Sequence, residues 1–177
     1  GNKLDLEPFE SDITEQTKHV INSGGLTYDL FWKEYKHKLS FFASSQHVDR
    51  NSYYGAQQDP NAYGKTKDLT FVGGGMYVGN FDKVLFSPAT FTAGMEYQHN
   101  KMHDIMAGYN RDLEQKVRIA SAFFQNEWKM NDFTLLAGFR LDDHNLIDNL
   151  IFSPRVHMLY KPSDAFPGRL SWSTCFR

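Results

Sequence analysis

Tyrosines and amides in two polar stretches are the side chains best suited to bind a ligand. A tyrosine ring offers a stacking surface and a hydroxyl group, and an amide offers a hydrogen-bond donor beside an acceptor. The candidates for ligand binding are Tyr53, Tyr54, Gln57, Gln58 and Tyr63 in residues 49–65, and Tyr109 in residues 99–113. Together they suit a sugar, a siderophore or a corrin, although for any single residue an ordinary solvated loop role is the more common one.

Two groups of histidine and aspartate residues could ligate a metal ion if loops brought them together. His99, His103 and Asp104 lie in one polar stretch, and Asp142, Asp143 and His144 begin another. Zinc needs three or four such ligands in a fixed geometry, and calcium needs a larger set of oxygen atoms. Because nothing in the sequence fixes that geometry, we expect solvated loop residues and no tightly bound metal.

No arrangement of residues typical of catalysis is present in the sequence. A G-x-S-x-G nucleophile motif is absent, and the three glycines at residues 73–75 lack the Lys-Ser or Lys-Thr pair of a phosphate-binding loop. Cys175 lies in an apolar-alternating stretch, where it would pack as a small apolar side chain. We therefore expect a protein that is not an enzyme and that holds no cofactor.

The composition is rich in aromatic residues but hydrophilic on average. Of 177 residues, 15% are aromatic, yet the mean hydropathy is −0.54. No run approaches the roughly 18 apolar residues of a transmembrane helix, whereas strands that alternate apolar and polar residues give this combination. The net charge of −2 and the lack of a basic stripe argue against a nucleic-acid partner.

Alternation of apolar and polar residues recurs along the chain and predicts β-strands. It is clearest in residues 26–32, 90–98, 133–142 and 169–177, and weaker in residues 38–47, 69–78, 116–129 and 152–160. These segments predict about eight strands. Pro154 weakens the seventh because proline donates no ladder hydrogen bond. The glycines at residues 73–75 in the third suggest a bulge, or a place where a bulky neighbour needs room.

The connections between these segments alternate between shorter links and two long polar stretches, residues 49–65 and 99–113. Outer-membrane barrels have short turns on one rim and long loops on the other. Aromatic residues beside the short turns are typical of a girdle at the membrane surface; these are Trp32, Trp128, Phe133 and Tyr160. The predicted fold class is therefore all-β, an antiparallel up-and-down meander of about eight strands within a larger transmembrane β-barrel.

The alternation also assigns a face to each side chain. Residues two apart in a strand lie on one face, so one set should face a wet lumen and the other should face lipid. The lumen set is Glu96, Gln98, Gln125, Glu127, Arg140, Arg155 and Ser171. The lipid set is Phe91, Met95, Leu135, Phe139, Leu170 and Trp172.

Several segments resemble the barrel hairpins of TonB-dependent outer-membrane receptors. The resemblance rests on FQNEWK at residues 124–129 with LLAGFRLD at 135–142, and on FSPR at 152–155 with LSWSTCFR at 170–177. SYYG at residues 52–55 and AGMEY at 93–97 also fit, and the resemblance covers about residues 26–177. Cys175 stands where glycine is common in these receptors, a minor departure from the pattern.

The resemblance implies part of a barrel of roughly twenty-two strands with a plug domain inside. Such receptors import a scarce, large nutrient, such as a siderophore, cobalamin or a glycan, across the outer membrane of Gram-negative bacteria with energy from TonB. The implied partners are outer-membrane lipid, the nutrient, and TonB through an N-terminal part of the receptor. That part, the plug and the final strand have no counterpart in the sequence. We therefore expect residues 1–177 to form a partial barrel domain, with residues 1–16 as a loop or opening segment.

Two alternatives remain open on the sequence. Eight strands suffice for a complete small outer-membrane barrel that acts as an adhesin or structural protein. The strands could also form a soluble β-sandwich that binds carbohydrate. An arc of a larger barrel would instead have two unpaired edge strands, and for that case we expect the isolated chain to self-associate.

Overall fold

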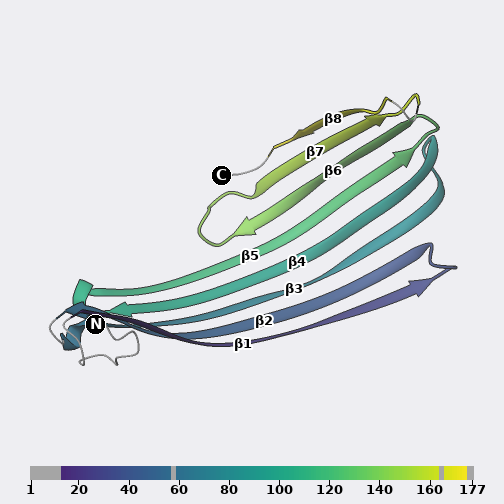
Figure 1. Ribbon diagram of the computed structural model, residues 1–177. Coiled ribbons are helices and arrows are strands. Elements are labelled where there is room, and N and C mark those ends of the chain that lie inside the picture. Colours follow the sequence, from purple (N-terminus) through teal and green to yellow (C-terminus); the bar gives the residue numbers. More distant parts are fainter. Residues whose placement is uncertain (1–12, 57–58, 164–165, 175–177) are drawn as a thin grey trace. The chain divides into compact units, whose positions relative to one another are not determined.

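The computed structural model describes residues 13–56, 59–163 and 166–174. Strands and two short 3-10 helices follow one another along the chain (Figure 1). The strands are β1 (Ile13–Trp32), β2 (His37–Ala56), β3 (Tyr63–Val84), β4 (Ser87–Met106), β5 (Arg111–Lys129), β6 (Phe133–His144), β7 (Ile151–Tyr160) and β8 (Gly168–Ser173), and the helices are η1 (Pro60–Ala62) and η2 (Ala107–Tyr109). Within the described ranges, no helix is long and apolar enough to cross a membrane.

All eight strands belong to one sheet, in the order β1 to β8, so that each strand pairs with its neighbours in sequence. In the antiparallel register of β5 to β8, Phe124 lies opposite Phe139 and Met158 lies opposite Leu170. The predicted all-β meander is confirmed. The β-sandwich alternative is wrong, because a sandwich needs a second sheet and the described strands form only one.

The chain divides into two compact units, and strands β1 to β5 contribute to both. Of the described residues, unit 1 comprises 13–25, 44–56, 59–71 and 99–117, and unit 2 comprises 26–43, 72–98, 118–163 and 166–174. Strands β6 to β8 therefore lie wholly in unit 2.

A row of aromatic side chains crosses one face of unit 2. The rings of Tyr77, Phe91, Phe124, Phe139 and Phe152, one from each of β3 to β7, contact one another in that order, with centroids 5.9, 5.0, 5.7 and 5.8 Å apart. Phe91 and Phe139 both belong to the predicted lipid set. Other members of that set are uncovered, with Met95 71% and Trp172 56% exposed. A continuous exposed apolar face is typical of a sheet that meets lipid.

The other face of unit 2 carries a hydrogen-bonded polar cluster around Arg140. Its Nε lies 2.7 Å from Asp142 Oδ1, and its Nη2 lies 3.2 Å from Glu96 Oε1. Ser121 Oγ accepts from Arg140 Nη2 at 2.8 Å and donates to Asp142 Oδ1 at 2.5 Å. Glu96 and Arg140, both in the predicted lumen set, therefore share one face, as the alternation requires.

The local surroundings explain how glycine and proline are accommodated within the strands. β3 runs unbroken through residues 73–75. A Cβ on Gly74 would lie 2.4 Å from the carbonyl oxygen of Met95 and 2.9 Å from the Phe42 ring, so a bulky neighbour does need room there. Pro154 lies inside β7, and its carbonyl accepts from the backbone N–H of Thr174 at 3.2 Å.

Aromatic side chains lie beside the short connections of unit 2. Trp32 stacks on His37 with centroids 5.4 Å apart, and Trp128 stacks on Phe86 at 5.7 Å. Trp128 Nε1 also donates to the carbonyl of Val84 at 3.1 Å. A ring with one satisfied polar end suits the level of lipid headgroups, where the girdle is predicted.

The prediction of two long polar loops is wrong. β2 continues to Ala56 and β3 begins at Tyr63, while β4 continues to Met106 and β5 begins at Arg111. β1 likewise begins at Ile13, inside the segment predicted to be a loop. These strand portions have polar residues at successive positions, which removes the alternation signal, although the ladder of backbone hydrogen bonds needs no apolar face to continue.

Candidate ligand-binding site

Unit 1 contains the ends of two hairpins, each closed by a short 3-10 helix. In the β2–β3 hairpin, Asp59 caps η1 by accepting from the backbone N–H of Asn61 at 2.8 Å. In the β4–β5 hairpin, Asn110 ends η2 in the left-handed conformation, with a φ of 49°. A Cβ on Gly108 would lie 2.9 Å from the carbonyl oxygen of Asn61. The two hairpin ends are therefore in direct contact, and glycine permits their close approach.

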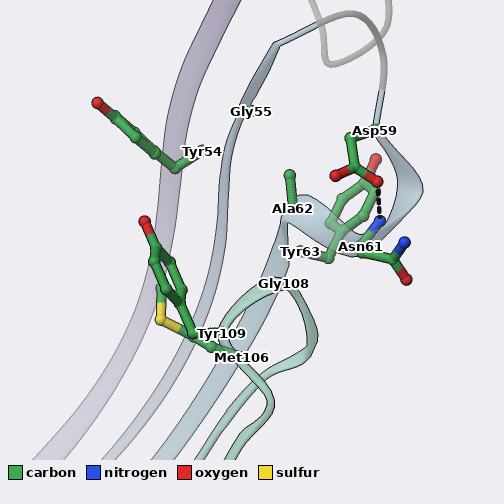
Figure 2. Close-up of a pocket in the computed structure, with 9 residues that line it drawn as sticks. All are labelled: Tyr54, Gly55, Asp59, Asn61, Ala62, Tyr63, Met106, Gly108 and Tyr109. Carbon is green, nitrogen blue, oxygen red and sulfur yellow. Dashed lines mark hydrogen bonds between the residues drawn. The ribbon is translucent and has the colours of Figure 1, made fainter.

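A pocket of about 420 Å³ lies between these hairpin ends (Figure 2). It is lined by Tyr54, Gly55, Asp59, Asn61, Ala62, Tyr63, Met106, Gly108 and Tyr109. Figure 2 shows Tyr54 and Tyr109 on one side, with Asp59, Asn61 and Tyr63 on the other. Tyr54 is 59% exposed and Tyr109 is 69% exposed, so both rings are accessible to a ligand. The walls thus combine stacking surfaces with a carboxylate and an amide.

Tyr53 packs behind this lining rather than in it. Its side chain is buried, and its ring meets the ring of Tyr63 edge to face with centroids 4.9 Å apart. Burial raises the pKa of the Tyr53 hydroxyl, and the nearby Tyr63 and Asp59 raise it further. The phenol therefore stays protonated at neutral pH, and its contribution is to fix the position of the Tyr63 ring.

The structure brings together half of the predicted ligand-binding residues. Tyr54, Tyr63 and Tyr109 line the pocket, Tyr53 supports it, and Gln57 and Gln58 lie outside the described residues. The lining also includes residues that the candidate set lacks; these are Gly55, Asp59, Asn61, Ala62, Met106 and Gly108. For Asp59 and Asn61, the available sequence signal was their place beside the tyrosines in the same polar stretch. For Met106 and Gly108 there was no such signal, because the contact between the two hairpins depends on strand register.

A buried carboxylate joins four strands of unit 1. Asp104 in β4 is 5% exposed and accepts from Thr66 Oγ1 in β3 at 2.5 Å. Its Oδ1 lies 3.6 Å from Arg50 Nη2 in β2, and its Oδ2 forms an ion pair with Arg111 in β5. The Thr66 hydrogen bond and the two guanidinium groups hold the pKa of Asp104 below its usual range, against the effect of burial. The cluster stabilises the hairpins that carry the pocket.

The candidate metal ligands are not assembled into a site. His103 Nε2 lies 2.8 Å from Asp112 Oδ1, whereas the adjacent Asp104 pairs with arginines instead. Asp142 is bound by Arg140, and His144 Nδ1 accepts from a backbone N–H within its own turn. Among the described residues, no group of three or more His, Cys, Asp or Glu side chains could hold a metal ion. Adjacent residues of a strand point to opposite faces, which separates residues that look clustered in sequence.

Comparison with known proteins gives a family and several similar structures. The family profile described as TonB dependent receptor-like, beta-barrel matches residues 4–177. The siderophore receptor PirA from Pseudomonas aeruginosa is similar with a TM-score of 0.70 and 18% identity, over 85% of this chain and 25% of that chain. The siderophore receptor PirA from Acinetobacter baumannii is similar with a TM-score of 0.69 and 18% identity, over 84% of this chain and 24% of that chain. The ferric citrate transporter FecA is similar with a TM-score of 0.59 and 12% identity, over 85% of this chain and 26% of that chain.

Comparison with curated protein sequences gives no match. The chain spans about a quarter of the length of the solved receptors that it resembles, and at these identities the likeness concerns the fold alone.

Proposed function

The chain belongs to the TonB-dependent receptor β-barrel family, and from this premise we propose that it contributes nutrient capture to an importing receptor. The family consists of transport receptors of the outer membrane of Gram-negative bacteria, so the chemistry asked of the chain is binding and release. The observation that carries the proposal is the pocket of about 420 Å³ between the hairpin ends of unit 1. It is lined mainly by tyrosines, an amide and a carboxylate, which suit a large ligand rich in oxygen atoms.

A siderophore or another iron chelate is the first candidate for the nutrient. Three solved structures with a similar fold are described as siderophore receptors or a ferric citrate transporter. Phenol hydroxyls and the Asn61 amide can donate hydrogen bonds to the oxygen atoms of a chelate, and exposed rings can stack on its aromatic groups. In this proposal Tyr54 and Tyr109, which line the pocket and are exposed, make these contacts.

A glycan is the second candidate. Accessible tyrosine rings beside Asp59 and Asn61 offer the combination of stacking and paired polar contacts that sugar rings require. Cobalamin would use the same rings, but neither the lining nor the similar receptors favour it over the other two. Import would draw on TonB through the receptor's N-terminal part.

Ligand binding by the full-length receptor tests the proposal. We expect Tyr54→Ala and Tyr109→Ala each to weaken the affinity for a transported ferric chelate by roughly tenfold, because each removes an aromatic anchor. The matched control is Tyr28→Ala, an exposed tyrosine of β1 outside unit 1. Equilibrium binding measured by isothermal titration, alongside uptake in cells with and without TonB, gives the result.

An unchanged affinity in both pocket variants would overturn the assignment of this pocket. Uptake that persists without TonB would instead overturn the proposed energy source. If a panel of oligosaccharides binds with the same dependence on Tyr54 and Tyr109 and ferric chelates do not bind, the glycan candidate replaces the first.

A further inference from the structure

The wall of the ligand pocket contains one charged side chain. Residues 51–64 and 105–110, which form the two hairpin ends, contain a single charged residue, Asp59. Asp59 lines the pocket and is exposed, and Figure 2 shows its carboxylate on the same side as Tyr63. Among the described residues, no ion pair joins Asp59 to a basic side chain. The wall itself therefore presents negative charge to a ligand.

The carboxylate of Asp59 is held in place by the backbone. Its Oδ1 accepts from the N–H of Asn61 at 2.8 Å, which is the bond that caps η1. An exposed aspartate is ionised at neutral pH and can only accept hydrogen bonds. The oxygen atoms of a ferric chelate are acceptors too, so they cannot bond to this carboxylate. An ammonium or N–H group on the ligand can.

The basic side chains beside the pocket are engaged with another carboxylate. Arg111 Nη2 lies 3.1 Å from the sulfur of Met106, a lining residue, but Arg111 itself is outside the lining. Arg111 forms an ion pair with Asp104, and Arg50 lies 3.6 Å from the same carboxylate. This cluster has one positive charge in excess, but neither guanidinium group lines the pocket. Because the interaction between charges weakens with distance, Asp59 should act more strongly on a bound ligand.

Resting on the proposed function, we propose that Asp59 selects the nutrient by charge, so that the pocket binds neutral or cationic ferric chelates and disfavours anionic ones. Three singly charged hydroxamates balance the charge of a ferric ion, whereas catecholates, which are doubly charged, leave the complex anionic. A ferric trihydroxamate that carries a protonated amine therefore suits the wall best, with its amine at Asp59 and its chelate against Tyr54 and Tyr109. A like charge at the same place opposes binding, so one carboxylate can discriminate between chelates.

Equilibrium binding of three forms of one linear ferric trihydroxamate to the full-length receptor tests this proposal. The forms differ only at the chain end, which is a free amine, an N-acetyl amide or an N-succinyl amide, so they are cationic, neutral and anionic. We expect the cationic form to bind about tenfold more tightly than the anionic form, with the neutral form between them. High salt should reduce the difference.

The variant Asp59→Asn removes the charge and keeps the shape of the side chain. Asparagine caps a helix about as well as aspartate does, so η1 should be preserved. We expect the difference between the cationic and anionic forms to fall to about twofold or less in this variant. The control is Asp112→Asn, an exposed aspartate of unit 1 outside the pocket lining, which should leave the preference unaltered.

Equal binding of the three forms by the unmodified receptor, or tighter binding of the anionic form, would overturn the proposal. A preference for the cationic form that persists in Asp59→Asn would overturn the role of Asp59. If the anionic form binds best and this preference is lost in Arg111→Gln, the pocket takes an anion through Arg111 instead.

The variants Tyr54→Ala and Tyr109→Ala separate a failure of this inference from a failure of the proposed function. If no trihydroxamate form binds, but a ferric tris-catecholate binds with dependence on both tyrosines, selection by charge is wrong and the proposed function holds. If no chelate binds, or if binding is indifferent to both tyrosines, the proposed function of the pocket fails and this inference fails with it.

Discussion

Units 1 and 2 use the same strands in two different ways. In unit 2, the row from Tyr77 to Phe152 makes one face apolar, while Arg140 and its partners make the other face polar. In unit 1, β4 makes polar contacts on both faces, through Lys101 and His103 on one face and Asp104 on the other. The difference shows that backbone pairing sustains a strand without an amphipathic pattern, whereas an apolar face opposite a polar face is typical of a sheet that meets lipid.

Of the changes considered, a charge placed on the apolar face of unit 2 should have the largest effect on stability. We expect Phe139→Arg to destabilise the full-length receptor by about 2–4 kcal/mol, because an arginine within the apolar row, on the face expected to meet lipid, must leave water. The matched change in unit 1 is Ile105→Arg, also at an exposed apolar position, for which we expect about 0–1 kcal/mol. Urea-induced unfolding in lipid vesicles measures both.

An equal loss of unfolding free energy in the two arginine variants would contradict the expectation that the apolar face of unit 2 meets lipid and that unit 1 meets water. A large loss of unfolding free energy in Ile105→Arg with a small loss in Phe139→Arg would reverse that expectation.

The contrast also explains what the sequence could predict. Phe91, Met95 and Phe139 lie in strands whose apolar and polar residues alternate, as expected for lipid on one side and water on the other, so their strands and shared faces were predictable. The unit 1 portions of β1 to β5 have polar side chains on both faces, with scattered apolar ones such as Ile105, and no periodic signal distinguishes them from loops. Their strand character comes from pairing with neighbours that extend equally far.

The candidate site was predictable only in part, for a related reason. Tyr54 and Tyr63 stand out by residue type, and Tyr109 by its place in the second polar stretch. Met106 and Gly108 belong to the pocket only because η2 packs against η1, and this contact depends on hairpin length and register. The Asp104 cluster was missed for the same reason, since its arginines come from other strands.

Substitution of one glycine in each unit should give a smaller difference in stability between the units. A Cβ on Gly74 in unit 2 would approach the carbonyl oxygen of Met95, whereas a Cβ on Gly24 in unit 1 would meet nothing within 4 Å. We expect Gly74→Ala to destabilise the receptor by about 1–3 kcal/mol through displacement of β3 from β4. We expect Gly24→Ala to change stability by no more than about 0.5 kcal/mol. Thermal unfolding of the two variants checks this, and a harmless Gly74→Ala would show that the close approach relaxes freely.

The smallest expected effect concerns the response of unit 1 to acid. The Thr66 hydrogen bond and the Arg111 and Arg50 guanidinium groups lower the pKa of Asp104 relative to an unfolded chain. The stabilisation from this carboxylate is therefore complete above its unfolded pKa of about 3.9, and is lost as the pH falls through the lower folded value. Between pH 5 and 8 we expect no change from this group.

Amide hydrogen exchange of the β2–β3 and β4–β5 hairpin ends, followed from pH 7 to pH 3, measures the loss of local protection with a correction for the intrinsic exchange rate. Protection should hold to about pH 4 and then fall. Asp104→Asn should lower protection at neutral pH by about 1 kcal/mol and flatten this acid response, because a neutral amide cannot compensate Arg50 and Arg111. Glu114→Gln is the control, since Glu114 also has a lowered pKa but pairs with exposed lysines and contacts neither arginine. An acid response that survives in Asp104→Asn and disappears in Glu114→Gln would place the sensitivity on Glu114 and its partners Lys101 and Lys116 instead.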